Sequence, residues 1–217
     1  MHQTKSLRRC SIVVALATAV LVWPAAGVAQ LGGILPSPSP TTTSTVVGDA
    51  SAVRVSVLGI LGTATSTALA DTGTLSGVND ARDASMVTGS VPSTLSAETL
   101  SAATISWVDQ VDSEASLANL NMTVAGVGIT ADLIMARASQ VLGAAGSGSS
   151  ILSNLSINGT PIAVTGAPNQ AIWIPGGQVI INEQTISSTG TAVVNALHVA
   201  VTGVADVVIA SATAGVS

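Results

Sequence analysis

The chain has 217 residues, with 6 basic and 11 acidic side chains that give a net charge of −5, and it contains three Trp but no Phe or Tyr. Such an acidic chain cannot neutralise a phosphate backbone, and so few aromatic rings offer no platform on which bases could stack. The composition therefore excludes nucleic-acid binding.

Residues 1–29 have the pattern of a secretory signal peptide. Basic residues precede an apolar run at 10–23, and the small residues Gly27 and Ala29 predict cleavage after Ala29. The run is too short for a membrane anchor, which needs about 20 residues. The segment holds three of the six basic residues and the single Cys, so the exported chain has net charge −8, no Cys and no Lys. These absences exclude a disulfide, a cysteine nucleophile and a Lys–Asn isopeptide bond.

Residues 30–46 are rich in Pro, Ser and Thr and are expected to form a disordered stem. Residues 47–217 have a length that suits one domain. Within it, the apolar alternation of 51–61 predicts a strand that places Val53, Val55 and Val57 on one face. For 64–100, rich in Ser, Thr, Ala and Gly, we expect short strands and loops.

Residues 131–142 could form a helix on propensity alone. We predict a long strand instead, because the Gly- and Ser-rich stretch after it reads as the tip of a hairpin. An internal echo supports this reading, since 116–122 and 151–157 share Leu, Asn and Leu at matching positions. Two copies are too few for a solenoid. We interpret them as equivalent strands of one sheet system, with Asn119 and Asn154 at a turn or bulge.

Residues 168–184 contain a Pro-Gly-Gly turn between alternating segments, which predicts a hairpin. The apolar segment 191–213 could be a second hairpin or a membrane span. A span would place Asp206 in the bilayer at a cost of about 2.5–3.5 kcal/mol, so we expect a hairpin and no membrane span in the mature chain. In this hairpin we expect one face to lie in the core and His198 to lie on the other, beside Ala196 and Ala200. The predicted core residues are Val193, Leu197, Val199 and Val201.

These elements predict one all-β domain, an antiparallel β-sandwich of jelly-roll-like type. A parallel β-helix is the alternative. Both architectures suit short alternating strands separated by turns.

The candidate chemistry is sparse, and we predict no catalytic residue, no metal site and no cofactor. His198 is the only His of the exported chain, and a lone His on a strand is most often structural. Asp109, Asp112 and Glu114 could bind Ca²⁺, but their spacing matches no defined calcium loop, and we interpret them as a solvated turn. No two of the acidic residues stand out as a glycosidase pair.

Trp107 and Trp173 are the two Trp residues of the exported chain. We expect both to be buried, because the core has no other aromatic side chain to supply bulk. Exposed on one surface beside a carboxylate-lined groove, they would instead favour a carbohydrate ligand. Which ligand that would be is unknown from the sequence.

Four segments of the C-terminal third, at 153–162, 168–184, 194–199 and 206–215, resemble the choice-of-anchor P family of bacterial surface proteins. The resemblance implies a secreted domain followed by one of several unrelated sorting tails, and it brings no catalytic residues. This chain stops at Ser217 without a sortase motif or a basic tail. We therefore expect release or non-covalent retention at the cell surface.

The expected function is a non-enzymatic extracellular structural or adhesive module. A secreted carbohydrate-binding or carbohydrate-degrading protein is the alternative. The expected partner is a cell-wall or matrix polymer or another copy of the chain.

Overall fold

The structure is a computed structural model that describes residues 44–58 and 64–217. The predicted signal peptide and residues 30–43 of the predicted stem lie outside these ranges, as do residues 59–61 of the first predicted strand. The described residues form strands and no helix. The strands are β1 (Val46–Leu58), β2 (Ala64–Asp71), β3 (Ala81–Val91), β4 (Leu95–Ser106), β5 (Gln110–Val124), β6 (Val127–Val141), β7 (Ser147–Ser153), β8 (Ser156–Ile157), β9 (Thr160–Pro161), β10 (Gln170–Ile174), β11 (Gly177–Ile186), β12 (Ala192–Val201) and β13 (Ala205–Val216).

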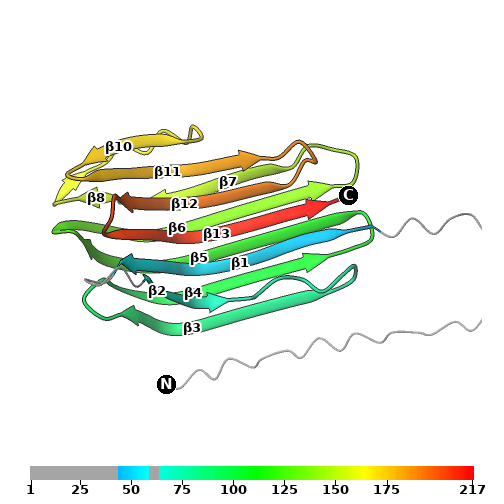
Figure 1. Ribbon diagram of the computed structural model, residues 1–217, viewed down its shortest axis with the longest axis horizontal. Coiled ribbons are helices and arrows are strands. Elements are labelled where there is room, and N and C mark those ends of the chain that lie inside the picture. Colours follow the sequence, from blue (N-terminus) through cyan, green and yellow to red (C-terminus); the bar gives the residue numbers. More distant parts are fainter. Residues whose placement is uncertain (1–43, 59–63) are drawn as a thin grey trace, which may run out of the picture. The chain divides into compact units, whose positions relative to one another are not determined.

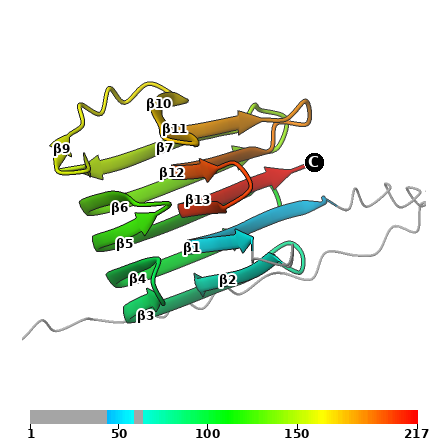
Figure 2. The same ribbon diagram turned by 60° about the vertical axis from the view of Figure 1, so that its left-hand side comes forward.

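Two antiparallel sheets pack face to face (Figures 1 and 2). Sheet A has the order β10-β11-β12-β13-β1-β2, and sheet B has the order β3-β4-β5-β6-β8-β9, with β7 also paired to β6. The predicted β-sandwich is confirmed, and the alternative parallel β-helix is wrong because every ladder is antiparallel. The chain passes between the sheets only after β2 and after β9. Its connectivity is therefore simpler than the two Greek keys of a jelly roll.

The core between the sheets consists of Ala, Val, Leu, Ile and Met. Strand β13 packs on β5 and β6, and β1 packs on β4 and β5, so the first and last strands lie over the middle of sheet B. No aromatic side chain of the described residues belongs to this core. The many Ala side chains allow close packing, and the branched residues supply most of the apolar area removed from water.

The face of β12 that meets the core changes partway along the strand. Buried residues occupy alternate positions from Ala192 to Ala196, and then alternate positions starting at Leu197. Leu197, Val199 and Val201 are buried as predicted, but Val193 lies on the outer face. The prediction for Val193 was wrong because it assumed one constant alternation along the strand.

In the neighbouring strands the alternation of inward and outward side chains shifts by one residue at the matching position. We call the row of these positions across each sheet the inversion line. In sheet A two successive residues face the core there, for example Ala52 and Val53 in β1. In sheet B two successive residues face solvent there, for example Glu98 and Thr99 in β4. Six residues along the line have positive φ: Ala70, Thr99, Asn119, Asn154, Asn182 and Ala210. Along this line sheet A turns an additional side chain toward the core in each strand, and sheet B turns one away.

The two echo segments are equivalent strands, as predicted. Strand β5 and the interrupted strand β7–β8 both pair antiparallel with β6, one on each side. Asn119 and Asn154 have φ of 50° and 53° and lie on the inversion line. Asn tolerates this left-handed conformation better than most residues. Each side chain also bonds a neighbouring carboxylate, Asn119 Nδ2 donating to Glu98 at 2.8 Å and Asn154 Nδ2 to Asp132 at 2.7 Å.

Of the remaining predicted elements, most are confirmed and one is wrong. Residues 131–142 lie almost entirely in β6, a strand as predicted, and the Pro-Gly-Gly turn joins β10 to β11. The apolar segment 191–213 is a hairpin as predicted. Its strands β12 and β13 pair along their length, from Val201 and Ala205 at the turn to Ala192 and Ala214 at the open end. The described residues contain no helix long and apolar enough to cross a membrane. The expectation of short strands over 64–100 was wrong, because β3 has 11 residues and β4 has 12.

One buried amide closes an end of the sandwich. Gln140 of β6 is 2% exposed and points inward. Its Nε2 donates to the carbonyl oxygens of Ala144 and Thr189 at 3.1 and 3.0 Å, and its Oε1 accepts from the Val216 amide at 2.9 Å. Gly190 lies against it at φ 89°, where an added Cβ would stand 2.2 Å from Gln140 Nε2. One side chain thus joins two turns and the last strand.

Candidate functional site

Both Trp residues of the described chain are exposed, which contradicts the expected burial. Trp173 is 81% exposed and Trp107 is 42% exposed. Trp173 lies on the edge strand β10 and alternates with Ile172 and Ile174, which pack against the core. Trp107 follows the last residue of β4, in the turn to β5. Neither position is covered by the opposite sheet, so the core closes without them.

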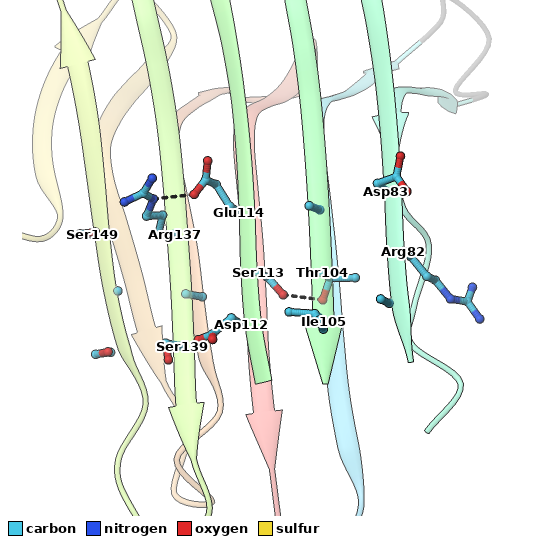
Figure 3. Close-up of a pocket in the computed structure, with 15 residues that line it drawn as sticks. Arg82, Asp83, Thr104, Ile105, Asp112, Ser113, Glu114, Arg137, Ser139 and Ser149 are labelled. Atoms are coloured by element: carbon cyan, nitrogen blue, oxygen red, sulfur yellow. Dashed lines mark hydrogen bonds and ion pairs between the residues drawn. The ribbon is translucent and has the colours of Figure 1, made fainter. Parts of the chain in front are cut away.

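A groove of about 810 Å³ crosses the outer face of sheet B from β3 to β7, and we call it the sheet B groove (Figure 3). One row of direct cross-strand partners in it is Asp83, Ala103, Glu114, Arg137 and Ser149. The next row is Ala81, Ile105, Asp112, Ser139 and Ser147. Five strands span about 19 Å at the usual spacing, which is enough for an extended oligomer.

Charged side chains stand on a groove floor of Ala and Ser. Arg137 Nε donates to Glu114 Oε2 at 2.6 Å, and Gln110 Nε2 donates to Asp112 Oδ2 at 2.8 Å. Both members of the first pair are well exposed, at 57% and 42%. Three carboxylates, those of Asp83, Asp112 and Glu114, therefore share the groove with one guanidinium, and the groove is acidic.

Arg82 lines the same groove but its guanidinium is directed away from it (Figure 3). Its Nε donates to Asp80 Oδ2 at 3.1 Å. The backbone amide and hydroxyl of Ser76 also donate to this carboxylate. Together with Arg82 these donors lower the pKa of Asp80 from 3.8 to about 2. The Asp80–Arg82 pair thus orders the entry to β3 and adds no net charge to the groove.

Buried hydroxyls tie the groove floor to the opposite sheet. Ser113 Oγ donates to the Thr213 carbonyl of β13 at 2.6 Å, and the hydroxyls of Thr104 and Ser113 lie 2.7 Å apart. Thr104 and Ser113 are 2% and 4% exposed. This bond between the sheets fixes the strands that carry Asp112 and Glu114. A site built on fixed strands keeps its geometry when a ligand arrives.

An exposed apolar patch lies along one side of the groove, at the ends of its strands. It lies at the β4–β5 and β6–β7 turns and consists of Trp107, Val108, Val141 and Leu142. The Leu142 amide donates to the Asp109 carbonyl at 2.7 Å, which links the two turns. Trp107 comes two residues after the groove residue Ile105, with the buried Ser106 between them. Alternation along the strand therefore places the indole on the groove face.

Asp109, Asp112 and Glu114, considered above as a calcium site, lie in different places and make different contacts. Asp109 lies in the β4–β5 turn, whereas Asp112 and Glu114 lie on the groove face, each bonded to a neighbouring side chain. Within residues 44–58 and 64–217, no three Asp, Glu, His or Cys side chains gather so that they could hold a metal ion.

His198 lies on the outer face of sheet A between two carboxylates. Its Nδ1 is 2.9 Å from Glu183 Oε2, and its Nε2 is 3.0 Å from Asp206 Oδ2. Asn195 Nδ2 also bonds Glu183. Burial lowers the pKa of His198, but the hydrogen bonds and charges of Asp206 and Glu183 outweigh it and raise the pKa above 6.5.

The expected small-residue surroundings of His198 were only half right. Ala200 does lie on the outer face, but Ala196 is buried because the inversion line falls between it and His198. Asn195 takes its place on the outer face. Sequence reasoning also missed the carboxylates of Glu183 and Asp206 as partners of this ring, and Arg137 as the partner of Glu114. These contacts join neighbouring strands, and only the strand register could have revealed them.

Comparison of the chain with protein-family models, curated proteins and solved structures gives no match.

Proposed function

We propose that the protein is a non-enzymatic extracellular adhesive module that binds a matrix or cell-wall polysaccharide along the sheet B groove. The observation that carries this proposal is the exposed Trp107 beside a groove of carboxylates and hydroxyls. A sugar ring packs its apolar face on an indole, and its hydroxyls bond to carboxylates, so this combination suits a glycan. This adhesive role combines the structural expectation with the carbohydrate-binding alternative.

The charge of the groove narrows the class of polysaccharide. The groove holds the carboxylates of Asp83, Asp112 and Glu114 but only the guanidinium of Arg137, and the chain after residue 29 carries net charge −8. Such a surface repels polyanions and attracts or tolerates cationic and neutral chains. The proposed ligand is therefore a neutral or amino-sugar polymer.

The proposal is for binding without hydrolysis. Glycosidases use one carboxylic acid as a proton donor and one carboxylate as base or nucleophile, and the donor works in a desolvated pocket. Glu114 is instead 42% exposed and paired with Arg137, on the open face of a sheet. Release of reducing ends from a bound polymer would contradict this part of the proposal.

Affinity electrophoresis of the purified protein in gels that contain hydroxyethyl cellulose, glycol chitosan or alginate tests the binding. We expect retardation by the first two polymers and none by alginate. Trp107→Ala should weaken groove binding at least tenfold, since an aromatic anchor of a binding surface contributes about 2 kcal/mol or more. Ile186→Ala, which removes an exposed apolar side chain from sheet A, is the matched control and should bind normally. Equal binding by Trp107→Ala would refute the groove as the site.

The extracellular location rests on the signal-peptide pattern, and membership of the choice-of-anchor P family would agree with it. Recovery from the medium of a chain that begins at Gln30 tests the location. A chain that stays inside the cell with residues 1–29 attached would contradict it.

A further inference from the structure

The outer face of sheet A carries a second exposed aromatic beside polar groups. Trp173 pairs across the ladder with Gln178, Gln178 with Ala200, and Ala200 with Asp206. Three strand spacings put the backbones of Trp173 and Asp206 about 14 Å apart. Gln178 and Ala200 lie between them on the same outer face, and Ala200 contributes only a methyl group there.

A line of hydrogen-bonding groups lies beside this row on the same face. Asp206, His198 and Glu183 are joined through the two ring nitrogens of His198, at 3.0 and 2.9 Å. Asp206 is 58% exposed at its side chain, so its carboxylate can be reached from solvent. The groups sit on three adjacent strands, β11 to β13, and their mutual bonds hold them in place. Such a fixed acceptor line suits a ligand rich in hydroxyl or amino groups.

A hollow lies at Ala200 and Asp206, on the side away from Trp173. A cavity of about 300 Å³ lies over the β12–β13 turn and is lined by Ser56, Ala200, Thr202 and Asp206 among others. Trp173, Gln178, Ala200 and this cavity therefore follow one another across the outer face of sheet A. Single exposed apolar residues are common on protein surfaces. Trp173 differs because it is 81% exposed and lies next to a row of polar side chains, and exposed Trp side chains often dominate binding.

We propose that this outer face of sheet A is a second polysaccharide-binding surface and that the protein cross-links two polymer chains. The two surfaces lie on opposite sides of the sandwich, because each is the outer face of a different sheet. Both are acidic, so both select neutral or amino-sugar polymers. The class of ligand rests on the proposed function, but the second surface stands on its own residues.

The two indole N–H groups provide separate probes of the two surfaces. We would titrate ¹⁵N-labelled protein that lacks residues 1–29 with β-1,4-linked hexamers of glucosamine and of glucose, and assign the signals with Trp107→Ala and Trp173→Ala. Both indole signals should shift and saturate. Each should keep its binding curve within twofold when the other Trp is removed. Ile186→Ala, again the control, should leave both curves unchanged.

The outcomes separate the two proposals. If the Trp107 signal shifts and the Trp173 signal does not, the second surface is refuted while the groove proposal stands. If only the Trp173 signal shifts, the groove proposal fails and the second surface remains. With long glycol chitosan, the unmodified protein should raise the viscosity, and each single variant should lose that increase while it still binds. Viscosity that is unchanged by Trp173→Ala would contradict cross-linking through sheet A.

Discussion

Replacing Gln140 by Leu removes the buried amide that closes one end of the sandwich, with little change in volume. The Val216 amide is then left unpaired in the core, at a cost of about 1–3 kcal/mol. The carbonyls of Ala144 and Thr189 lie nearer the surface and can take up water, so each lost bond costs about 0.5–1.5 kcal/mol. Burial of the leucine offsets about 1 kcal/mol. We therefore expect the free energy of unfolding to fall by about 3 kcal/mol.

Urea unfolding followed by circular dichroism measures this loss. With a slope near 2 kcal/mol per M, the midpoint should fall by about 1.5 M. Gln178→Leu makes the same change on the half-buried outer face of sheet A and should shift the midpoint by less than about 0.3 M. A loss below 1 kcal/mol for Gln140→Leu would mean that the three bonds do not hold the turns and the last strand together.

Three further predictions concern substitutions of single residues in the strands. Because the pKa of His198 is raised in the folded state, its contribution to stability is fully present below pH 6.5 and is lost as the pH rises through the folded pKa; His198→Gln should abolish this pH dependence in thermal unfolding. Val199→Asp buries an unpaired charge and should prevent folding, whereas Val193→Asp, in the same strand beyond the inversion line, should cost less than about 1 kcal/mol by urea unfolding. Asn119→Ala should lose about 1 kcal/mol because of its positive φ, and Asn119→Gly, which tolerates that φ, should lose less than half as much.

The sequence predicted much of the strand arrangement because period-2 patterns and turn residues are local signals. The β10–β11 hairpin follows from Ile172 and Ile174 before a Pro-Gly-Gly turn, and the strand β6 follows from the Gly-rich tip after it. The equivalence of β5 and β7–β8 was visible because Asn119 and Asn154 occupy the same place in two similar segments.

The inversion line could not be predicted, because it depends on register across both sheets. Ala210 and Ala70 adopt positive φ on that line although Ala carries no local signal for it. The exposure of Trp107 and Trp173 was missed for a related reason. Burial was expected from the bulk of the side chain, but their places in a turn and on an edge strand decide the outcome. The candidate site also depends on contacts between residues far apart in the sequence, since Glu114 and Arg137 meet only through the pairing of β5 with β6.

The pairing of β1 with β13 determines how the domain responds to mechanical force. Val46 pairs with Val216, and the amide of Thr45 donates to the carbonyl of Ser217, so residues 45 and 217 leave the sheet at the same end. Tension applied between these two residues would open the ladder one hydrogen bond at a time, as a zipper opens. Tension applied between the two outer faces would instead load the whole core at once. The ladder between β1 and β13 therefore yields stepwise when residues 45 and 217 are pulled apart.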